Sequence, residues 1–170
     1  MENLVYAIVL LPLFGFLFNG LFGKSLPKIV VGSIATLVVF ASFCIAVSLF
    51  LNFNADSQPV IVRAFEWFRV NGIQVNFGFQ IDQLSLMMIM IITGIGSLIH
   101  LYSIGYMSHD KGFYKFFSYL NLFIFSMLLL VMGSNYLILF IGWEGVGLCS
   151  YLLIGFWYTN KEYGAAARKA

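Results

Sequence analysis

Two ionisable residues, Glu144 and His100, lie inside long apolar runs of this 170-residue chain. Glu144 interrupts the otherwise uncharged stretch "IGWEGVGLCSYLLIGFW". A charged side chain at the centre of a membrane helix costs about 2.5–3.5 kcal/mol, so such a residue is by default a functional candidate. One interpretation of Glu144 is a carboxylate that relays protons or ions. The alternative is a permanently neutral carboxyl group that only hydrogen-bonds two helices together.

His100 belongs to a polar face of a second apolar run. Because successive helical residues turn by 100°, Asp82 and His100 lie on one face after five turns. Small and hydroxyl residues follow the same line, namely Ser85, Thr93, Gly96 and Ser103. Such residues are typical of close helix–helix seams, which is the interpretation favoured for them. His100 could be a proton relay or a hydrogen-bonded packing residue, and Asp82 could cap the start of the helix.

The composition indicates a membrane protein. Hydrophobic residues make up 61% of the chain and charged residues 9%, against about 25% charged in ordinary soluble domains. A net charge of +2 without a basic cluster argues against nucleic-acid binding. Cys44 and Cys149 both stand in apolar stretches and are interpreted as small packing residues. The N-terminus is expected to be a retained membrane helix and not a signal peptide.

Five segments are apolar enough and long enough to cross a bilayer as helices. They cover roughly residues 4–22, 29–51, 81–106, 116–132 and 136–157. The predicted fold is therefore an all-α polytopic membrane protein. Its expected units are helices one and two in residues 1–58, an extramembrane hairpin in 59–80, and helices three to five with a tail in 81–170.

The hairpin prediction comes from Asn71-Gly72, the strongest short-range hairpin signal, within an alternating sequence. A two-residue turn pairs Val70 with Ile73 and Phe68 with Val75. These four residues and Phe77 then share one apolar face. Because an isolated two-stranded hairpin is marginally stable in water, this face is expected to dock on other protein, such as a neighbouring subunit.

No recognisable device for binding a redox cofactor or nucleotide occurs in the sequence. It holds no G-x-G-x-x-G, Walker loop or cysteine ligand set, and no pair of membrane histidines at haem-binding spacing. No metal site is predicted.

The run "GWEGVGLCSYLLIGFW" resembles the fifth helix of the subunit L family of proton-pumping NADH:quinone oxidoreductase, respiratory complex I, called subunit 5 in mitochondria. "DQLSLMMIMIITGIGSLIHLYSIGYMSHD" and "FFSYLNLFIFSMLLLVMGSNYLILFIGWE" resemble its neighbouring helices. The resemblance covers nearly the whole chain, and it implies an N-terminal part of a longer proton-translocating subunit. It also implies that Glu144 pairs with a lysine on a later helix, outside this chain.

The same resemblance sets expectations for cofactors and partners. NAD, FMN, iron–sulfur clusters and quinone are expected on other subunits, so this chain would be a part of a translocase without a redox centre of its own. Expected partners are the lipid bilayer and other complex I membrane subunits, including a second antiporter-like subunit. Two rival interpretations are the large subunit of a multisubunit sodium/proton antiporter and a membrane scaffold that transports nothing.

Lysine and arginine placement predicts the orientation in the membrane. With the N-terminus outside, seven basic residues lie in inside connections and two, Arg63 and Arg69, lie outside. The expected location is the bacterial cytoplasmic (inner) membrane with a periplasmic N-terminus; the alternative is an organellar energy-transducing membrane.

We therefore expect Lys24, Lys111 and Lys161 to face the cytoplasm and Asn71 to face the opposite side. Single cysteines at these four positions, labelled in intact membranes with a reagent that cannot cross them, would test this. Labelling of position 71 from the cytoplasmic side alone would reverse the orientation.

Overall fold

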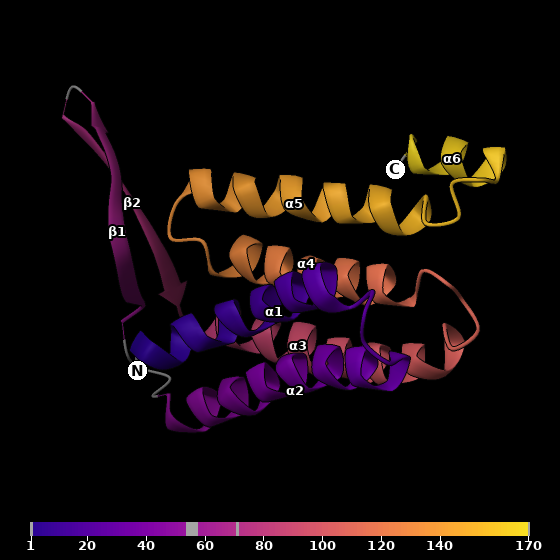
Figure 1. Ribbon diagram of the computed structural model, residues 1–170. Helices are drawn as coiled ribbons and strands as arrows, with labels where there is room; N and C mark the ends of the chain where they lie inside the picture. Colours follow the sequence, from indigo (N-terminus) through magenta and orange to yellow (C-terminus); the bar gives the residue numbers. More distant parts are fainter. Residues whose placement is uncertain (1, 54–57, 71, 170) are drawn as a thin grey trace.

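The computed structural model describes residues 2–53, 58–70 and 72–169, and within them it shows five long helices, a hairpin and one short helix (Figure 1). Their bounds are α1 Glu2–Phe22, α2 Lys28–Asn52, β1 Val60–Val70, β2 Ile73–Ile81, α3 Gln83–Tyr106, α4 Phe113–Met132, α5 Tyr136–Ile154 and α6 Lys161–Ala167. The helices α1 to α5 are each long and apolar enough to cross a membrane. The predicted polytopic fold, with a hairpin between spans two and three, is confirmed.

Four predicted helix ends differ from the structure by two or three residues, because α1 begins at Glu2, α3 at Gln83 and α4 at Phe113, and α5 ends at Ile154. Ile81 belongs to β2, and α3 begins after Asp82. The Asp82 carboxylate accepts from Ser85 N at 2.8 Å, and Ser85 Oγ accepts from Asp82 N at 2.8 Å. This capping box confirms Asp82 as the helix cap, and the Ser85 backbone donor and the Gln80 side chain lower its pKa. The fifth helix ends at Ile154, and Trp157 lies in the following turn.

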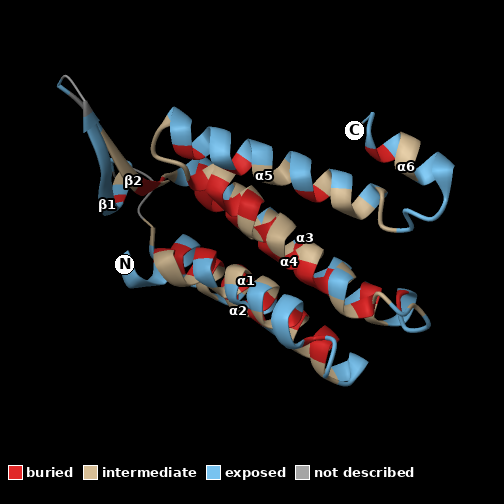
Figure 2. Cartoon of the chain, turned by 45° about the horizontal axis from the view of Figure 1, so that its top comes forward, coloured by how far each residue is buried: buried red, intermediate tan, exposed pale blue. Residues whose placement is uncertain are grey.

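The five long helices run alternately in opposite directions (Figure 1). The hairpin and the α4–α5 connection lie at the end of the bundle where α1 begins, and the α1–α2, α3–α4 and α5–α6 connections lie at the other. Helix α4 packs against α1, α2, α3 and α5. Its residues Phe117 and Leu128 are fully buried. Figure 2 shows that burial is densest along α3 and α4, whereas α5 presents a long exposed side.

The hairpin has the predicted register near its tip. Phe68 pairs with Val75 and Val70 with Ile73, as expected. An irregularity between Glu66 and Phe68 then shifts the pairing so that Phe65 meets Phe77, and a second one follows between Arg63 and Phe65. Gly72 has the positive φ of 84° that the predicted turn needs, whereas Asn71 and the side chains of Val70 and Ile73 lie outside the described residues.

The base of the hairpin is attached to the helical bundle. Ser134 N donates to the Gly78 carbonyl at 3.2 Å, and Asn135 Nδ2 donates to the Asn76 carbonyl at 2.8 Å. Tyr6 of α1 donates to the Arg63 carbonyl at 3.0 Å. Towards the tip, Phe65, Trp67 and Phe68 are exposed in this chain. The bundle therefore holds the lower half of the hairpin and leaves the aromatic tip uncovered.

Helix α5 packs on α4 through a face of small residues. Gly142 and Cys149 are buried there, and a side-chain carbon built on Gly142 would collide with the backbone of Leu130. One built on Gly145 would stand 2.6 Å from Ser126 Oγ, closer than side-chain atoms approach in real structures. These glycines allow the two helix backbones to approach closely, as small residues do at membrane helix seams.

We expect Gly142→Ala to destabilise the bundle and Gly147→Ala to leave it unchanged or slightly more stable. The methyl group added at position 142 has no space beside Leu130, and overpacking of this kind costs about 1–3 kcal/mol. At Gly147 no other atom of the described residues lies within 4 Å of the added carbon. Alanine is also the better helix former by up to about 1 kcal/mol. Thermal unfolding of the 170-residue chain in detergent, followed by circular dichroism, compares the two. Equal unfolding midpoints would contradict the close α4–α5 contact.

Candidate functional site

Glu144 lies on the side of α5 that faces away from α4. Its face is shared by residues at helical spacing, and the exposed members include Phe140, Gly147 and Tyr151. The packed face, which contains Gly142 and Cys149, is on the other side of the helix. The carboxylate is thus directed away from the bundle of the first four helices.

Among the described residues, Glu144 forms no hydrogen bond and no ion pair. The ion pair that these residues do form joins Glu66 to Arg69 on the hairpin. A carboxylate in hydrocarbon needs a partner, since an isolated charge is strongly disfavoured there. The side of α5 that carries Glu144 faces away from α4, and no side chain of the described residues pairs with this carboxylate.

His100 occupies the opposite kind of position, because it is 1% exposed and its ring packs against α4. Its Nδ1 lies 2.7 Å from the Gly96 carbonyl oxygen, and its ring packs 6.1 Å from that of Phe117 on α4. Its Nε2 has no hydrogen-bond partner in the structure. His100 is therefore held firmly by one nitrogen, while the other is available for further contact.

Two hydroxyl residues of α3 are paired within their own helix. Thr93 Oγ1 donates to the Ile89 carbonyl at 2.7 Å, and Ser97 Oγ donates to the Gly94 carbonyl at 2.7 Å. Gly96 leaves space that Ile124 of α4 fills, because a carbon built there would stand 2.6 Å from Ile124 Cδ1. These contacts are those of a helix–helix seam, as the sequence predicted for the small and hydroxyl residues.

Two buried amides near His100 were not singled out by the sequence reasoning. Asn19 of α1 and Asn121 of α4 both have no exposed surface. Asn19 Oδ1 and both terminal atoms of Asn121 lack hydrogen-bond partners. The signal was present in the sequence, since "FLFNGLF" and "SYLNLFIF" each place an amide inside an apolar helix.

The structure does not bring Glu144 and His100 together. Helix α5 packs on α4 and α6, whereas α3 packs on α2 and on the other side of α4. Helix α4 consequently separates the carboxylate from the histidine. Any direct proton exchange between the two would have to pass around or through α4.

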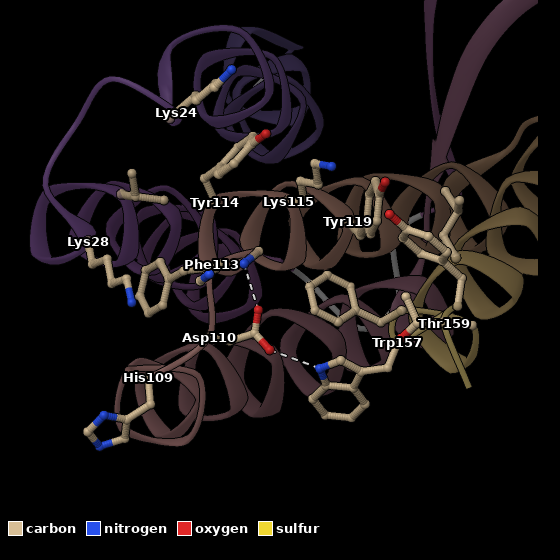
Figure 3. Close-up of a pocket in the computed structure, with 18 of the residues that line it drawn as sticks. Lys24, Lys28, His109, Asp110, Phe113, Tyr114, Lys115, Tyr119, Trp157 and Thr159 are labelled. Atoms are coloured by element: carbon tan, nitrogen blue, oxygen red, sulfur yellow. Dashed lines mark hydrogen bonds between the residues drawn. The ribbon is translucent and has the colours of Figure 1, made fainter.

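A cavity of about 1090 Å³ opens at the end of the bundle opposite the hairpin (Figure 3). Basic residues contributed by two connections gather around it, namely Lys24, Lys28, His109, Lys111 and Lys115. Within it, Asp110 accepts from Trp157 Nε1 at 2.9 Å and from Gly112 N at 2.6 Å. The Trp157 donor, the Gly112 donor and the nearby charge of Lys28 lower the pKa of Asp110. This carboxylate therefore ties the α3–α4 connection to the end of α5.

Within residues 2–53, 58–70 and 72–169, no three His, Cys, Asp or Glu side chains are grouped closely enough to hold a metal ion. The chemistry available to the described chain is that of a carboxylate, a histidine and buried amides, which can accept and donate protons and hydrogen bonds.

Two segments of the chain match known protein families. Residues 67–117 match the family described as NADH-ubiquinone oxidoreductase (complex I), chain 5 N-terminus. Residues 133–170 match the transmembrane family shared by NADH:quinone oxidoreductase and the Mrp antiporter. The second match contains Glu144, and the first contains His100.

Relatives match across most or all of the chain. NADH-quinone oxidoreductase subunit L of Campylobacter jejuni is 50% identical over all of this chain and 27% of its own length. The subunit L of Mycobacterium tuberculosis is 48% identical over 82% of this chain and 22% of its own. NADH-ubiquinone oxidoreductase chain 5 of Hypocrea jecorina is 42% identical over 91% of this chain and 22% of its own. The chain spans about a quarter of the length of these curated relatives.

Two solved structures share the fold. The membrane-bound sulfane sulfur reductase, an archaeal respiratory membrane complex, aligns with a TM-score of 0.83 at 17% identity, covering 99% of this chain and 33% of that one. The Mrp complex of Dietzia aligns with a TM-score of 0.69 at 23% identity, covering 89% and 16%. The sequence matches place the chain in the family of NADH-quinone oxidoreductase subunit L and NADH-ubiquinone oxidoreductase chain 5.

Proposed function

We propose that this chain is part of a proton-translocating membrane subunit of an NADH:quinone oxidoreductase, which couples quinone reduction by NADH to proton transport. The observation that carries the proposal is Glu144, a carboxylate within an apolar helix that points away from its own bundle. The identity to subunit L proteins supports the assignment.

Glu144 is proposed as the proton-relay residue. Apolar surroundings favour the neutral form of a carboxyl group, whereas a nearby cation favours the ionised form. A cationic side chain approaching from outside the described helices could therefore switch its charge. One charge crossing a potential of 100 mV involves about 2.3 kcal/mol, an energy that a modest movement of such a partner can supply.

His100 is proposed as a second, possible proton-relay site. Its free Nε2 supports this role, because either ring nitrogen of a histidine can hold or release a proton. NAD, FMN, iron–sulfur clusters and quinone are proposed to be bound by other subunits of the complex, so that this chain contains no redox centre.

The proposed partners are other membrane subunits of the complex, including a second antiporter-like subunit, and the lipid bilayer. The proposed location is a bacterial cytoplasmic membrane, with the N-terminus on the periplasmic side. The clustering of Lys24, Lys28, Lys111 and Lys115 at one end of the bundle supports this orientation, since basic residues are enriched on the cytoplasmic side.

A sodium/proton antiporter subunit is the second candidate. The match of residues 133–170 to a family shared by NADH:quinone oxidoreductase and the Mrp antiporter fits this candidate as well. Proton movement that continues in vesicles without NADH, driven by a sodium gradient alone, would support the antiporter over the oxidoreductase subunit.

In the full-length subunit assembled in its complex, we expect Glu144→Gln to reduce proton pumping at least tenfold and Glu144→Asp to retain part of it. Glutamine keeps the shape and hydrogen bonding of glutamate but cannot ionise. The matched control is Glu162→Gln, which removes an exposed carboxylate outside the five long helices. Proton uptake by membrane vesicles during NADH oxidation measures the effect.

Normal pumping by the Glu144→Gln variant, with NADH oxidation also normal, would show that this carboxyl is structural. If the Glu144→Gln subunit assembles but does not pump, while the Glu162→Gln subunit pumps normally, the scaffold interpretation has no support.

The hairpin is proposed to dock on a neighbouring subunit. Phe68 is 41% exposed, and it shares a rung with Val75 beside the stacked rings of Phe65 and Phe77. We expect the double variant Phe68→Ser, Val75→Ser to weaken assembly with neighbouring subunits while leaving membrane insertion intact.

The adjacent rung gives a matched control, because Arg69 pairs with Gln74. The double variant Arg69→Ser, Gln74→Ser should assemble normally, since an exposed ion pair such as that of Arg69 contributes at most about 1 kcal/mol. Native gels of solubilised membranes give the assembled fraction, and equal assembly of the two double variants would contradict docking through the aromatic face.

A further inference from the structure

Three buried polar side chains, one each from α1, α4 and α3, lie inside the bundle: Asn19, Asn121 and His100, here called the amide–histidine cluster. The two amides have no exposed surface, and His100 is 1% exposed. Four of their polar atoms have no hydrogen-bond partner in the protein: Asn19 Oδ1, Asn121 Oδ1, Asn121 Nδ2 and His100 Nε2. Buried polar atoms are nearly always paired, so these four orphaned atoms require an explanation.

The hydrogen bond of His100 fixes what its free nitrogen can do. A carbonyl oxygen can only accept, so Nδ1, at 2.7 Å from the Gly96 carbonyl, must carry the proton and donate. In the neutral imidazole Nε2 is then an acceptor with a free lone pair. The cluster consequently presents three unpaired acceptors, namely this nitrogen and the two amide oxygens, and one unpaired donor group, Asn121 Nδ2.

The packing places these atoms close to one another. A side-chain carbon built on Gly15 would stand 3.0 Å from Cγ and Nδ2 of Asn121, so this amide lies directly on α1, one turn before Asn19. Asn121 also lies beside the His100 ring, although the two make no hydrogen bond of ordinary geometry. By contrast Ser118, one turn earlier on α4, donates to the Phe16 carbonyl of α1 at 2.9 Å.

We propose that the amide–histidine cluster binds ordered water. A water molecule both donates and accepts, so it can serve the lone pair of His100 and the oxygen and nitrogen of Asn121 together. A site lined by polar atoms of this kind is where buried water is expected, since leaving the same atoms dry carries their full desolvation penalty. The cluster contains no carboxylate, so it offers nothing to balance the charge of a bound cation.

Asn19 lies close to the wall of the basic cavity. Asn19 Nδ2 donates to the Val31 carbonyl at 3.5 Å, and Val31 lines that cavity. Phe113 also lines it and packs against Phe117, with ring centroids 4.7 Å apart.

The consequence for transport rests on the proposed function. Protonation of Nε2 would turn an acceptor into a donor, and a neighbouring water can accept that bond without any movement of the helices. His100 would thus exchange a proton with that water, at a point separated from Glu144 by α4.

A density map of the full-length subunit in its assembled complex, sharp enough to show ordered water, tests the proposal directly. We expect density about 2.7–3.2 Å from His100 Nε2 and from a terminal atom of Asn121. The Asn121→Leu variant, which keeps the volume and removes both polar atoms, should lose this density. Ser118→Ala is the control, because the Ser118 hydroxyl is already paired within the protein, and it should retain the density.

A direct bond from Asn121 to His100 Nε2 with no density between them would overturn the proposal, as would density with the coordination of a metal ion. If Asn121→Leu fails to assemble, the map of the unchanged protein still decides. We also expect this variant to pump several-fold more slowly, whereas Ser118→Ala should not. Because the density is seen whether or not protons are pumped, failure of the water site and failure of the proposed function give different results.

Discussion

The whole structure depends on the cost of leaving a polar group unpaired in an apolar interior. Backbone groups escape this cost by forming helices, which is why five long helices account for most of the chain. Hydroxyl side chains escape it locally, as Thr93 and Ser97 do by donating to carbonyls of their own helix. What remains unpaired is then conspicuous. In the described residues it comprises Glu144 on the outside of α5 and the amide–histidine cluster inside the bundle.

Helix α4 organises these exceptions because it carries polar residues on two faces. Asn121 and Ser118 point towards α1 and α3, whereas Ser126 lies under Gly145 of α5. The glycines of α5 permit backbone-close packing on α4, and that packing turns Glu144 outward. The direction of the carboxylate is therefore fixed by small residues on the opposite side of its helix, and not by any contact of its own.

Much of this could be predicted from the sequence, because the signals are local. Apolar runs of about 20 residues gave the helices, Asn71-Gly72 gave the hairpin, and the spacing from Asp82 to His100 gave the buried face of α3. Helix ends were less predictable. Ile81 is apolar enough for either a strand or a helix, and the Asp82 cap decides between them. Likewise α5 stops before Trp157, whose bond to Asp110 joins segments 47 residues apart.

The relation between Glu144 and His100 could not have been predicted from one-dimensional patterns. Each residue marks a polar position within its own helix, but only the packing order shows that α4 stands between the two helices. Apolar side chains of α4, such as Leu128 and Ile124, lie between these two polar groups. Among the described residues no hydrogen-bonded chain crosses α4, so protons have no direct route between the two sides. A low-dielectric interior strengthens the interaction between charges, so α4 blocks proton transfer without abolishing electrostatic interaction. The close α4–α5 seam also links the positions of the two helices, because its glycine contacts leave little room for one to shift without the other.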